Sequence, residues 1–178
     1  MKIREASISD LRDVLFVERA AFDREDEADL VRDLFEDASA RPLLSLLAYE
    51  GQQPLGHILF IRARLRDAPR EVAISLLAPL AVVPAAQGAG IGDALIARGL
   101  QLLTKSGVEL VFVLGHPDYY PRHGFEPAGP LGLVAPYPIP AAHEDAWMVL
   151  GLRPGVIGKF QGRVVCADAL DKPEYWRE

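Results

Sequence analysis

The chain has 178 residues, 50% of them hydrophobic, and a formal net charge of −6. That length favours one domain with a sizeable core, which we expect to span residues 1–178. The acidic balance argues against a protein that binds nucleic acid, because duplex affinity depends on lysine and arginine. No apolar run approaches the ~20 residues of a membrane span, and the first residues lack a signal-peptide pattern, so we expect a cytoplasmic protein without a membrane segment.

Cysteine and metal chemistry find little support in the composition. The single cysteine, Cys166, cannot form an internal disulfide, and its apolar neighbours favour a small core residue over a nucleophile. No cluster of histidine, cysteine and acidic residues indicates a metal site, so we expect none.

The first half of the chain predicts a strand, two helices and three further strands. In order, these are a strand at 2–6, an amphipathic helix capped by Ser7 or Ser9 and ending near Phe22, a helix at about 27–37, a hairpin of strands 43–50 and 55–65 around Gly51-Gln52-Gln53-Pro54, and an extended run at 71–83. Pro79 interrupts the last of these. Because proline lacks the N–H that a regular ladder needs, we expect a β-bulge there.

The second half begins with a helix at 92–106, which Gly107 terminates. We then expect a strand at 108–114, parallel to 71–83, and a short helix that starts at Pro117, contains Tyr119 and Tyr120 and leads through Gly124-Phe125 into another strand. A loop at 129–140 and closing strands at 146–152 and 162–167 follow. The tail, Lys172 to Glu178, either caps the sheet or serves a homodimer contact.

Gln87-Gly88-Ala89-Gly90-Ile91-Gly92 is the most informative stretch, because it joins a strand to a helix. Glycines let backbone N–H groups approach an anion without a Cβ in the way, and the first turn of a helix adds unpaired N–H groups and about half a positive charge. This pattern predicts a site for a phosphate-bearing ligand.

Two familiar phosphate motifs fit the turn poorly. A P-loop ends in Gly-Lys-Ser/Thr, whereas Gly92 is followed by Asp93, so no lysine reaches a terminal phosphate. The dinucleotide fingerprint requires G-x-G-x-x-G, but these glycines fall at 88, 90 and 92. Glu109 stands at the right distance for a ribose-binding acid, yet it precedes an apolar run instead of ending it.

The turn, written Gln-x-x-Gly-x-Gly after a strand, resembles the pyrophosphate-binding segment of the GNAT superfamily of N-acetyltransferases. Three further segments resemble, in order and spacing, a bacterial subfamily of predicted acetyltransferases: His57 to Phe60, Leu77 to Pro84, and Val113 to Phe125 with its Tyr-Tyr-x-x-x-Gly-Phe. The resemblance covers about 2–152 and leaves 153–178 as closing strands and tail. It implies an α/β fold, with a mixed, mostly antiparallel sheet, splayed parallel strands four and five, and flanking helices.

The resemblance also implies acetyl-CoA as the cofactor. Backbone groups of Leu80, Ala81 and Val82 would then meet the pantetheine arm, and a backbone N–H near Val82 would stabilise the oxyanion. The pyrophosphate would be wrapped by Gln87, Gly88, Ala89, Gly90, Ile91 and Gly92. Tyr119 would pack or contact the pantetheine. Asp93 suits the helix dipole but repels a phosphate.

Tyr120 is the expected general acid, because related enzymes place a tyrosine hydroxyl at the cofactor sulfur four residues before the glycine. The alternative is an aromatic ring that only packs the short helix. The general base stays open between Glu18, His57, His116 and water. A histidine inside an apolar run is more often a hydrogen-bonded core residue, and Glu18 beside Arg19 suits a solvated helix face.

Two functional classes therefore remain. The first is an N-acetyltransferase acting on a primary amine of a small molecule, an amino acid or a protein. The second is a non-catalytic acyl-CoA sensor. Acidic residues at 23–29 could attract a cationic amine, although such a run is usually solvated.

Overall fold

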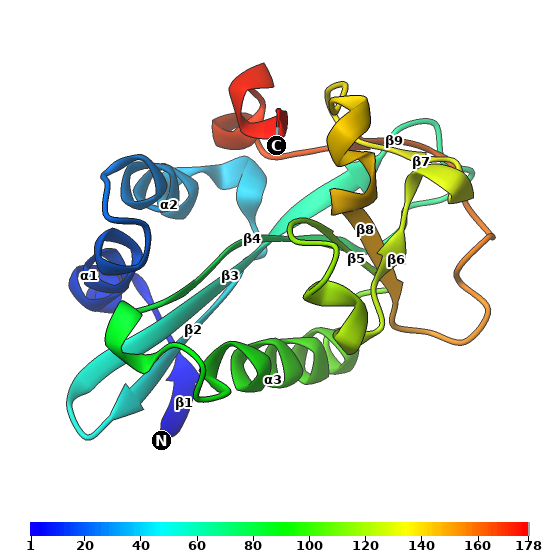
Figure 1. Ribbon diagram of the computed structural model, residues 1–178. Coiled ribbons are helices and arrows are strands. Elements are labelled where there is room, and N and C mark those ends of the chain that lie inside the picture. Colours follow the sequence, from blue (N-terminus) through cyan, green and yellow to red (C-terminus); the bar gives the residue numbers. More distant parts are fainter. Residues whose placement is uncertain (178) are drawn as a thin grey trace.

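The computed structural model describes residues 1–177, and a mixed sheet runs through its centre (Figure 1). Its strands are β1 (Lys2–Glu5), β2 (Leu44–Glu50), β3 (Gln53–Leu65), β4 (Ile74–Val82), β5 (Leu110–Leu114), β6 (Glu126–Pro127), β7 (Leu133–Val134), β8 (Trp147–Gly151) and β9 (Gly162–Val165). The main path runs β1-β2-β3-β4-β5-β8-β6. Along it, β4 and β5 are parallel and the other neighbours antiparallel, as the resemblance implied.

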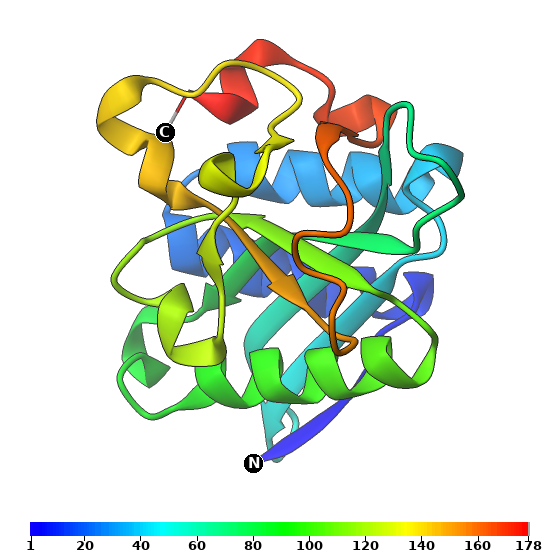
Figure 2. The same cartoon turned by 90° about the vertical axis from the view of Figure 1, so that its right-hand side faces the viewer.

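Helices cover both faces of this sheet. Helices α1 (Leu11–Phe22) and α2 (Asp26–Glu36) lie on one face and α3 (Ile91–Lys105) on the other, as Figures 1 and 2 show. The expected apolar positions point inward: Val14, Val17 and Leu34 are buried on the α1/α2 face, and Leu95 and Ile96 on the α3 face. Two apolar layers therefore enclose the strands.

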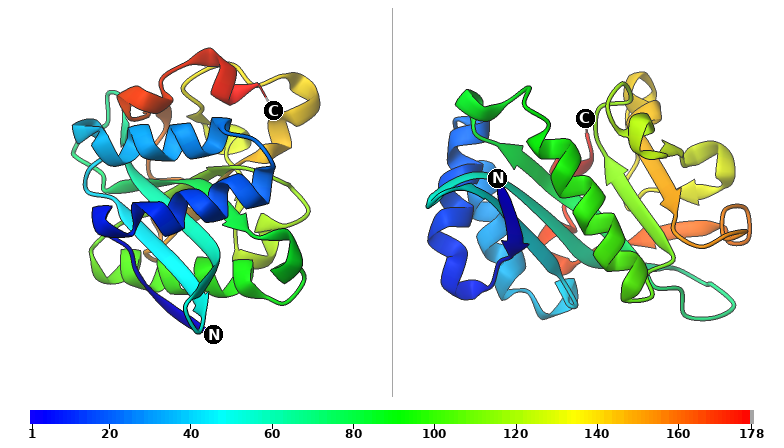
Figure 3. Two further views of the ribbon diagram at one scale, coloured as in Figure 1. Left: turned by 90° about the vertical axis from the view of Figure 1, so that its left-hand side faces the viewer. Right: turned by 90° about the horizontal axis from the view of Figure 1, so that it is seen from below.

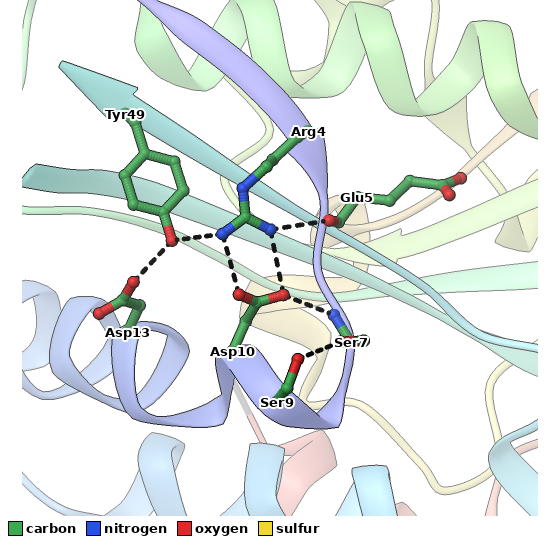
Figure 4. A network of polar contacts seen from close by, with 7 residues as sticks. All are labelled: Arg4, Glu5, Ser7, Ser9, Asp10, Asp13 and Tyr49. Carbon is green, nitrogen blue, oxygen red and sulfur yellow. Dashed lines mark hydrogen bonds and ion pairs between the residues drawn. The ribbon is translucent and has the colours of Figure 1, made fainter. Parts of the chain in front are cut away.

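A polar network holds the N-terminal strand to the start of α1 (Figure 4). The Arg4 guanidinium lies 2.8 and 3.1 Å from the two Asp10 carboxylate oxygens and stacks over the Tyr49 ring at 4.9 Å. Tyr49 in turn donates to Asp13 at 2.6 Å. Asp10 also accepts the backbone N–H of Ser7 at 2.9 Å, so β1, β2 and α1 share one set of contacts.

The expected hairpin and bulge are both present. Glu50 pairs with Gln53, which leaves a two-residue turn, Gly51-Gln52, in place of the four residues anticipated. Opposite Pro79, the register between β3 and β4 shifts between Ile58 and Phe60, and the bond from Ala78 to Pro79 is cis. The strand accommodates its proline by breaking the ladder.

Strands β4 and β5 separate at their carboxyl ends. Ile74 to Leu77 pair with Leu110 to Val113, and β4 then continues to Val82 beyond the last pair. The right-hand view in Figure 3 shows the two strands diverging behind α3. The second half of β4 therefore has β3 on one side and no strand on the other.

The C-terminal part differs from expectation. Strand β8 pairs with β5 as a closing strand should, but β9 pairs instead with the end of β3, at Arg64 and Leu65, and with β7. Strand β6 follows Gly124-Phe125, where a strand is expected, but it is only two residues long. The two-residue strand β7 lies inside the segment expected to be a loop. Trp176 is buried against Trp147, so the described part of the tail covers the core; Glu178 lies outside the described residues.

Candidate active site

The free edge of β4 presents two residues to the gap between the strands. Val83 N–H donates to Leu55 C=O at 2.9 Å, and Ala81 lies opposite His57. Hydrogen-bonded and non-hydrogen-bonded pairs alternate in an antiparallel ladder, so the backbone groups of Ala81 face β3 and those of Leu80 and Val82 face away from it. Of the three residues expected to meet the pantetheine, two thus offer main-chain groups to the gap.

The glycine turn is open to solvent and shaped by glycine. Gly88 and Gly90 have φ values of +79° and +83°, and a Cβ at either position would meet no atom within 4 Å. Gly88, Ala89 and Gly90 are exposed, and across residues 1–177 their N–H groups donate to no backbone carbonyl in a turn or loop. Together with the unpaired N–H groups at the start of α3, they form a run of free donors suited to an anion.

The ends of this turn are fixed to the protein. The Gln87 side-chain amide donates to Val82 C=O at 3.1 Å, so it closes the turn onto β4. Ile91, the first residue of α3, is buried, and a Cβ at Gly92 would stand 2.9 Å from the Tyr119 hydroxyl. Glycine at 92 therefore allows the tyrosine to lie over the first helical turn.

The carboxylate of Asp93, which follows the turn, is contacted by side chains of the segment 119–123. Its carboxylate accepts from the Tyr119 hydroxyl at 2.9 Å and lies 2.8 Å from His123 Nε2, and Arg122 is 3.4 Å away. These hydrogen bonds, that of Tyr119 first, lower the pKa of Asp93, while burial and the same carboxylate raise that of Tyr119 to about 12. Asp93 is thus the partner of His123, a pairing that sequence reasoning missed because the two residues are 30 positions apart.

Tyr120 combines a buried ring with an unpaired hydroxyl. It begins the 3₁₀ turn η4 (Tyr120–His123), a shorter helix than the one expected from Pro117, and its ring lies between Tyr119, Phe125 and Gly115. Within residues 1–177 the hydroxyl makes no hydrogen bond, yet it is not among the fully buried unpaired atoms, so it keeps contact with solvent. Burial raises the pKa of Tyr120 well above its usual value, so the phenol holds its proton.

Two of the expected bases are bonded to each other. Glu18 and His57 are both fully buried, with Glu18 Oε2 2.7 Å from His57 Nδ1, and His57 Nε2 2.8 Å from the Ser45 hydroxyl. Burial, opposed by the hydrogen bond to His57, raises the pKa of Glu18. The expectation that Glu18 lies on a solvated face is wrong, because this side of α1 packs against the sheet.

His116 remains the accessible candidate. It follows β5 and is exposed, and its carbonyl accepts the backbone N–H groups of Tyr119 and Tyr120 at 3.1 and 3.3 Å. An imidazole at this position can reach solvent while its backbone supports the tyrosine turn. Buried Glu18 and His57 can take part only through intervening groups.

Comparison with known proteins places this arrangement in a family. Residues 43–127 match the model of the acetyltransferase (GNAT) domain. An uncharacterized N-acetyltransferase of Escherichia coli strain K12, YjhQ, is 51% identical over 162 residues, which cover 90% of this chain and 88% of that protein. The chain belongs to the GNAT family of acetyltransferases. This confirms the family expected from the sequence and the expected class of enzyme, an acyltransferase.

Two solved GNAT structures share the whole fold. The Escherichia coli N-acetyltransferase YhbS, crystallised with CoA, has a TM-score of 0.86 and 28% identity, with 96% of this chain and 92% of that one covered. A GNAT acetyltransferase from Brucella melitensis, crystallised with acetyl-CoA, has a TM-score of 0.75 and 32% identity, covering 96% and 97%. The expected GNAT architecture is thereby confirmed, and the two relatives were crystallised with CoA and with the expected cofactor, acetyl-CoA.

Two features are absent from the described part of the chain, a membrane-spanning helix and a cluster of metal-binding side chains. Across residues 1–177 no helix is long and apolar enough to cross a bilayer. In the same part of the chain, no three histidine, cysteine or acidic side chains gather as a metal site would require.

Proposed function

We propose that this chain is an acetyl-CoA-dependent N-acetyltransferase that transfers an acetyl group to a primary amine. The observation that carries the proposal is the open glycine turn at 88–92, set at the carboxyl end of a strand whose outer edge is free. A thioester cofactor needs both features, since its diphosphate requires donors and its pantetheine arm requires strand-like backbone partners.

The cofactor would be held by backbone groups at two places. Gly88, Ala89 and Gly90 would donate N–H groups to the diphosphate at the positive end of α3. Leu80 and Val82 would pair with the amides of the pantetheine arm as an added strand does. Acetyl-CoA then supplies an activated acyl group, which the amine attacks.

Tyr120 would act as the general acid. Its raised pKa keeps the phenol protonated at neutral pH, and its hydroxyl is free to donate to the departing sulfur. The backbone N–H near Val82 would stabilise the negative charge that develops on the carbonyl oxygen. As the neutral amine forms the C–N bond and the C–S bond breaks, the sulfur takes the Tyr120 proton. The proton that the nitrogen loses after this attack, as the amide forms, restores the phenol.

Deprotonating the acceptor is a separate step. An alkylammonium with a pKa near 10.4 must lose a proton before attack, which costs about 4 to 5 kcal/mol at pH 7. His116, exposed beside the tyrosine turn, or solvent would take this proton. Glu18 and His57 are closed off from direct contact with an acceptor.

An acetyl-transfer assay across an amine panel tests the proposal against a non-catalytic acyl-CoA sensor. The panel should contain polyamines, amino acids, aminoglycosides and peptides with free N-termini or lysines, with CoA release as the readout. An N-acetyltransferase acetylates at least one class, and mass spectrometry finds the acetyl group on nitrogen. Tight acetyl-CoA binding without transfer to any class would favour the sensor.

A further inference from the structure

Asp93 poses a problem for a phosphate site. It stands in the first turn of α3, directly after the residues that would hold the diphosphate. A carboxylate there stabilises the helix through its dipole, but it also repels an approaching phosphate. A residue with opposed effects at a binding turn needs a structural explanation.

The contacts of Asp93 supply one. Tyr119 and His123 both approach the same carboxylate oxygen, at 2.9 and 2.8 Å, and Arg122 lies 3.4 Å from the other. Arg122 also stacks over the Tyr119 ring at 4.6 Å. All three partners belong to the segment 119–123, so the negative charge of Asp93 is matched by donors on the side of that segment.

The same contacts lead to Tyr120. The Tyr119 ring meets the Tyr120 ring edge to face at 5.1 Å, and the Tyr119 hydroxyl lies over Gly92. His123 meets the Tyr119 ring at 5.5 Å. The first turn of α3 and the tyrosine hydroxyl that would act as the acid are therefore joined by one side chain.

We propose that Asp93 is a positioning residue that couples the phosphate-binding turn to Tyr120. The contact with His123 holds the Asp93 carboxylate toward the segment 119–123, which weakens its repulsion of the cofactor phosphates. This inference rests on the proposed function and assigns a role in the same site. Asp93 touches neither reacting atom. It acts on turnover through Tyr119, and on cofactor affinity through its charge.

Three single variants and one double variant separate the two effects. Asp93→Asn removes the charge and keeps the oxygen that accepts both hydrogen bonds, whereas Asp93→Ala removes both. His123→Phe keeps an aromatic ring and removes one donor. The double variant combines Asp93→Asn with His123→Phe. Calorimetry gives the Kd of CoA, the amine-panel assay gives kcat with the best acceptor, and circular dichroism and melting confirm folding.

The expected pattern is not additive. His123→Phe should raise the Kd of CoA about fivefold, because the Asp93 carboxylate loses a hydrogen-bond partner and repels the phosphates more strongly. This loss of affinity should shrink at high salt, which screens the repulsion. Adding Asp93→Asn should return the Kd to within about twofold of the wild-type value. Asp93→Ala should lower kcat about tenfold with little loss of affinity, and Asp93→Asn should retain most of kcat.

A purely structural role gives a different pattern, in which the double variant binds CoA more weakly than either single one. That result, or a wild-type kcat in Asp93→Ala, would overturn the inference while leaving the proposed function intact. Wild-type protein that binds no CoA would instead remove the proposed function, and the inference with it.

Discussion

Tyr120 lies so close to Gly115 that a Cβ on residue 115 would overlap Cε2 of the tyrosine ring. Gly115 directly follows β5, and its N–H donates to Ala146 C=O at 3.0 Å, so its backbone is fixed next to the start of β8. The ring of Tyr120, the proposed acid, thus occupies space that is free only because residue 115 is glycine.

Replacing Gly115 by alanine should therefore misplace the Tyr120 hydroxyl. The ring must move away from the sheet, and a shift of about 1 Å can lower turnover on the order of 100-fold. We expect kcat for acetyl transfer to fall at least tenfold, while the Kd of CoA stays within about threefold. Wild-type turnover in this variant would show that the ring position is unimportant.

Tyr120→Phe removes the proposed proton donor and leaves the ring in place. We expect kcat to fall by about 10² to 10⁴, the usual contribution of general acid catalysis, with the Kd of CoA nearly unchanged. Stability should change by less than about 0.5 kcal/mol, because this hydroxyl makes no hydrogen bond in residues 1–177. A large loss of affinity with unchanged turnover would refute the acid assignment.

Glu18→Gln tests the buried pair beneath α1. The pKa of Glu18 is raised by burial and by Glu27, against the hydrogen bond to His57, so folding favours its protonated form. Stability of the wild-type protein should then fall as the pH rises above the ordinary carboxyl value of 4.5, until the raised pKa is passed.

The glutamine variant lacks that dependence and retains a hydrogen-bonding group beside His57. As the pH rises above 4.5, we expect its unfolding free energy to gain on that of the wild type. Urea unfolding at several pH values measures the difference. A difference that does not vary with pH would contradict the raised pKa.

Asp10→Asn probes the contact between β1 and α1, where the pKa of the carboxyl is lowered and not raised as it is for Glu18. Its hydrogen bond from Arg4 lowers the pKa of Asp10 from 3.8 to about 2, so the wild-type protein keeps this stabilisation above pH 3.8 and loses it as the pH falls towards 2. We expect the variant to be less stable by about 1 kcal/mol at pH 7, allowing for the exposure of Arg4, and nearly equal to the wild type at pH 2.

A matched control is available in the ion pair of Arg62 with Glu71, whose side chain is 83% exposed. Glu71→Gln should leave the melting temperature unchanged at both pH values, since exposed pairs contribute little. If both variants lose equal stability, the Arg4 network has no special role.

Much of the fold could be predicted from the sequence because its signals are local. Apolar spacing in α1, α2 and α3 follows the helical period, and Pro79 marks the bulge by lacking an N–H. The glycine turn could be predicted for the same reason, since Gly88 and Gly90 adopt positive φ values that other residues avoid.

What sequence could not supply were contacts between distant segments. Asp93 and His123 are 30 residues apart, and Glu18 and His57 are 39 apart, so nothing local pairs them. Strand β9 was expected to close the sheet, yet it pairs with β3, because strand propensity does not specify a partner. The two-residue strand β7 is too short to carry a pattern and lies within the predicted loop at 129–140.

The most direct test of the central claim is the affinity of CoA for Gly90→Asp, measured by calorimetry beside Gly155→Asp. Both glycines have positive φ, +83° and +76°, and a Cβ at either meets no atom within 4 Å, so the two variants carry similar backbone strain. Only the first adds bulk and negative charge to the proposed diphosphate site. We expect Gly90→Asp to weaken CoA binding at least tenfold and Gly155→Asp to bind as the wild type does; wild-type affinity in Gly90→Asp would contradict the account.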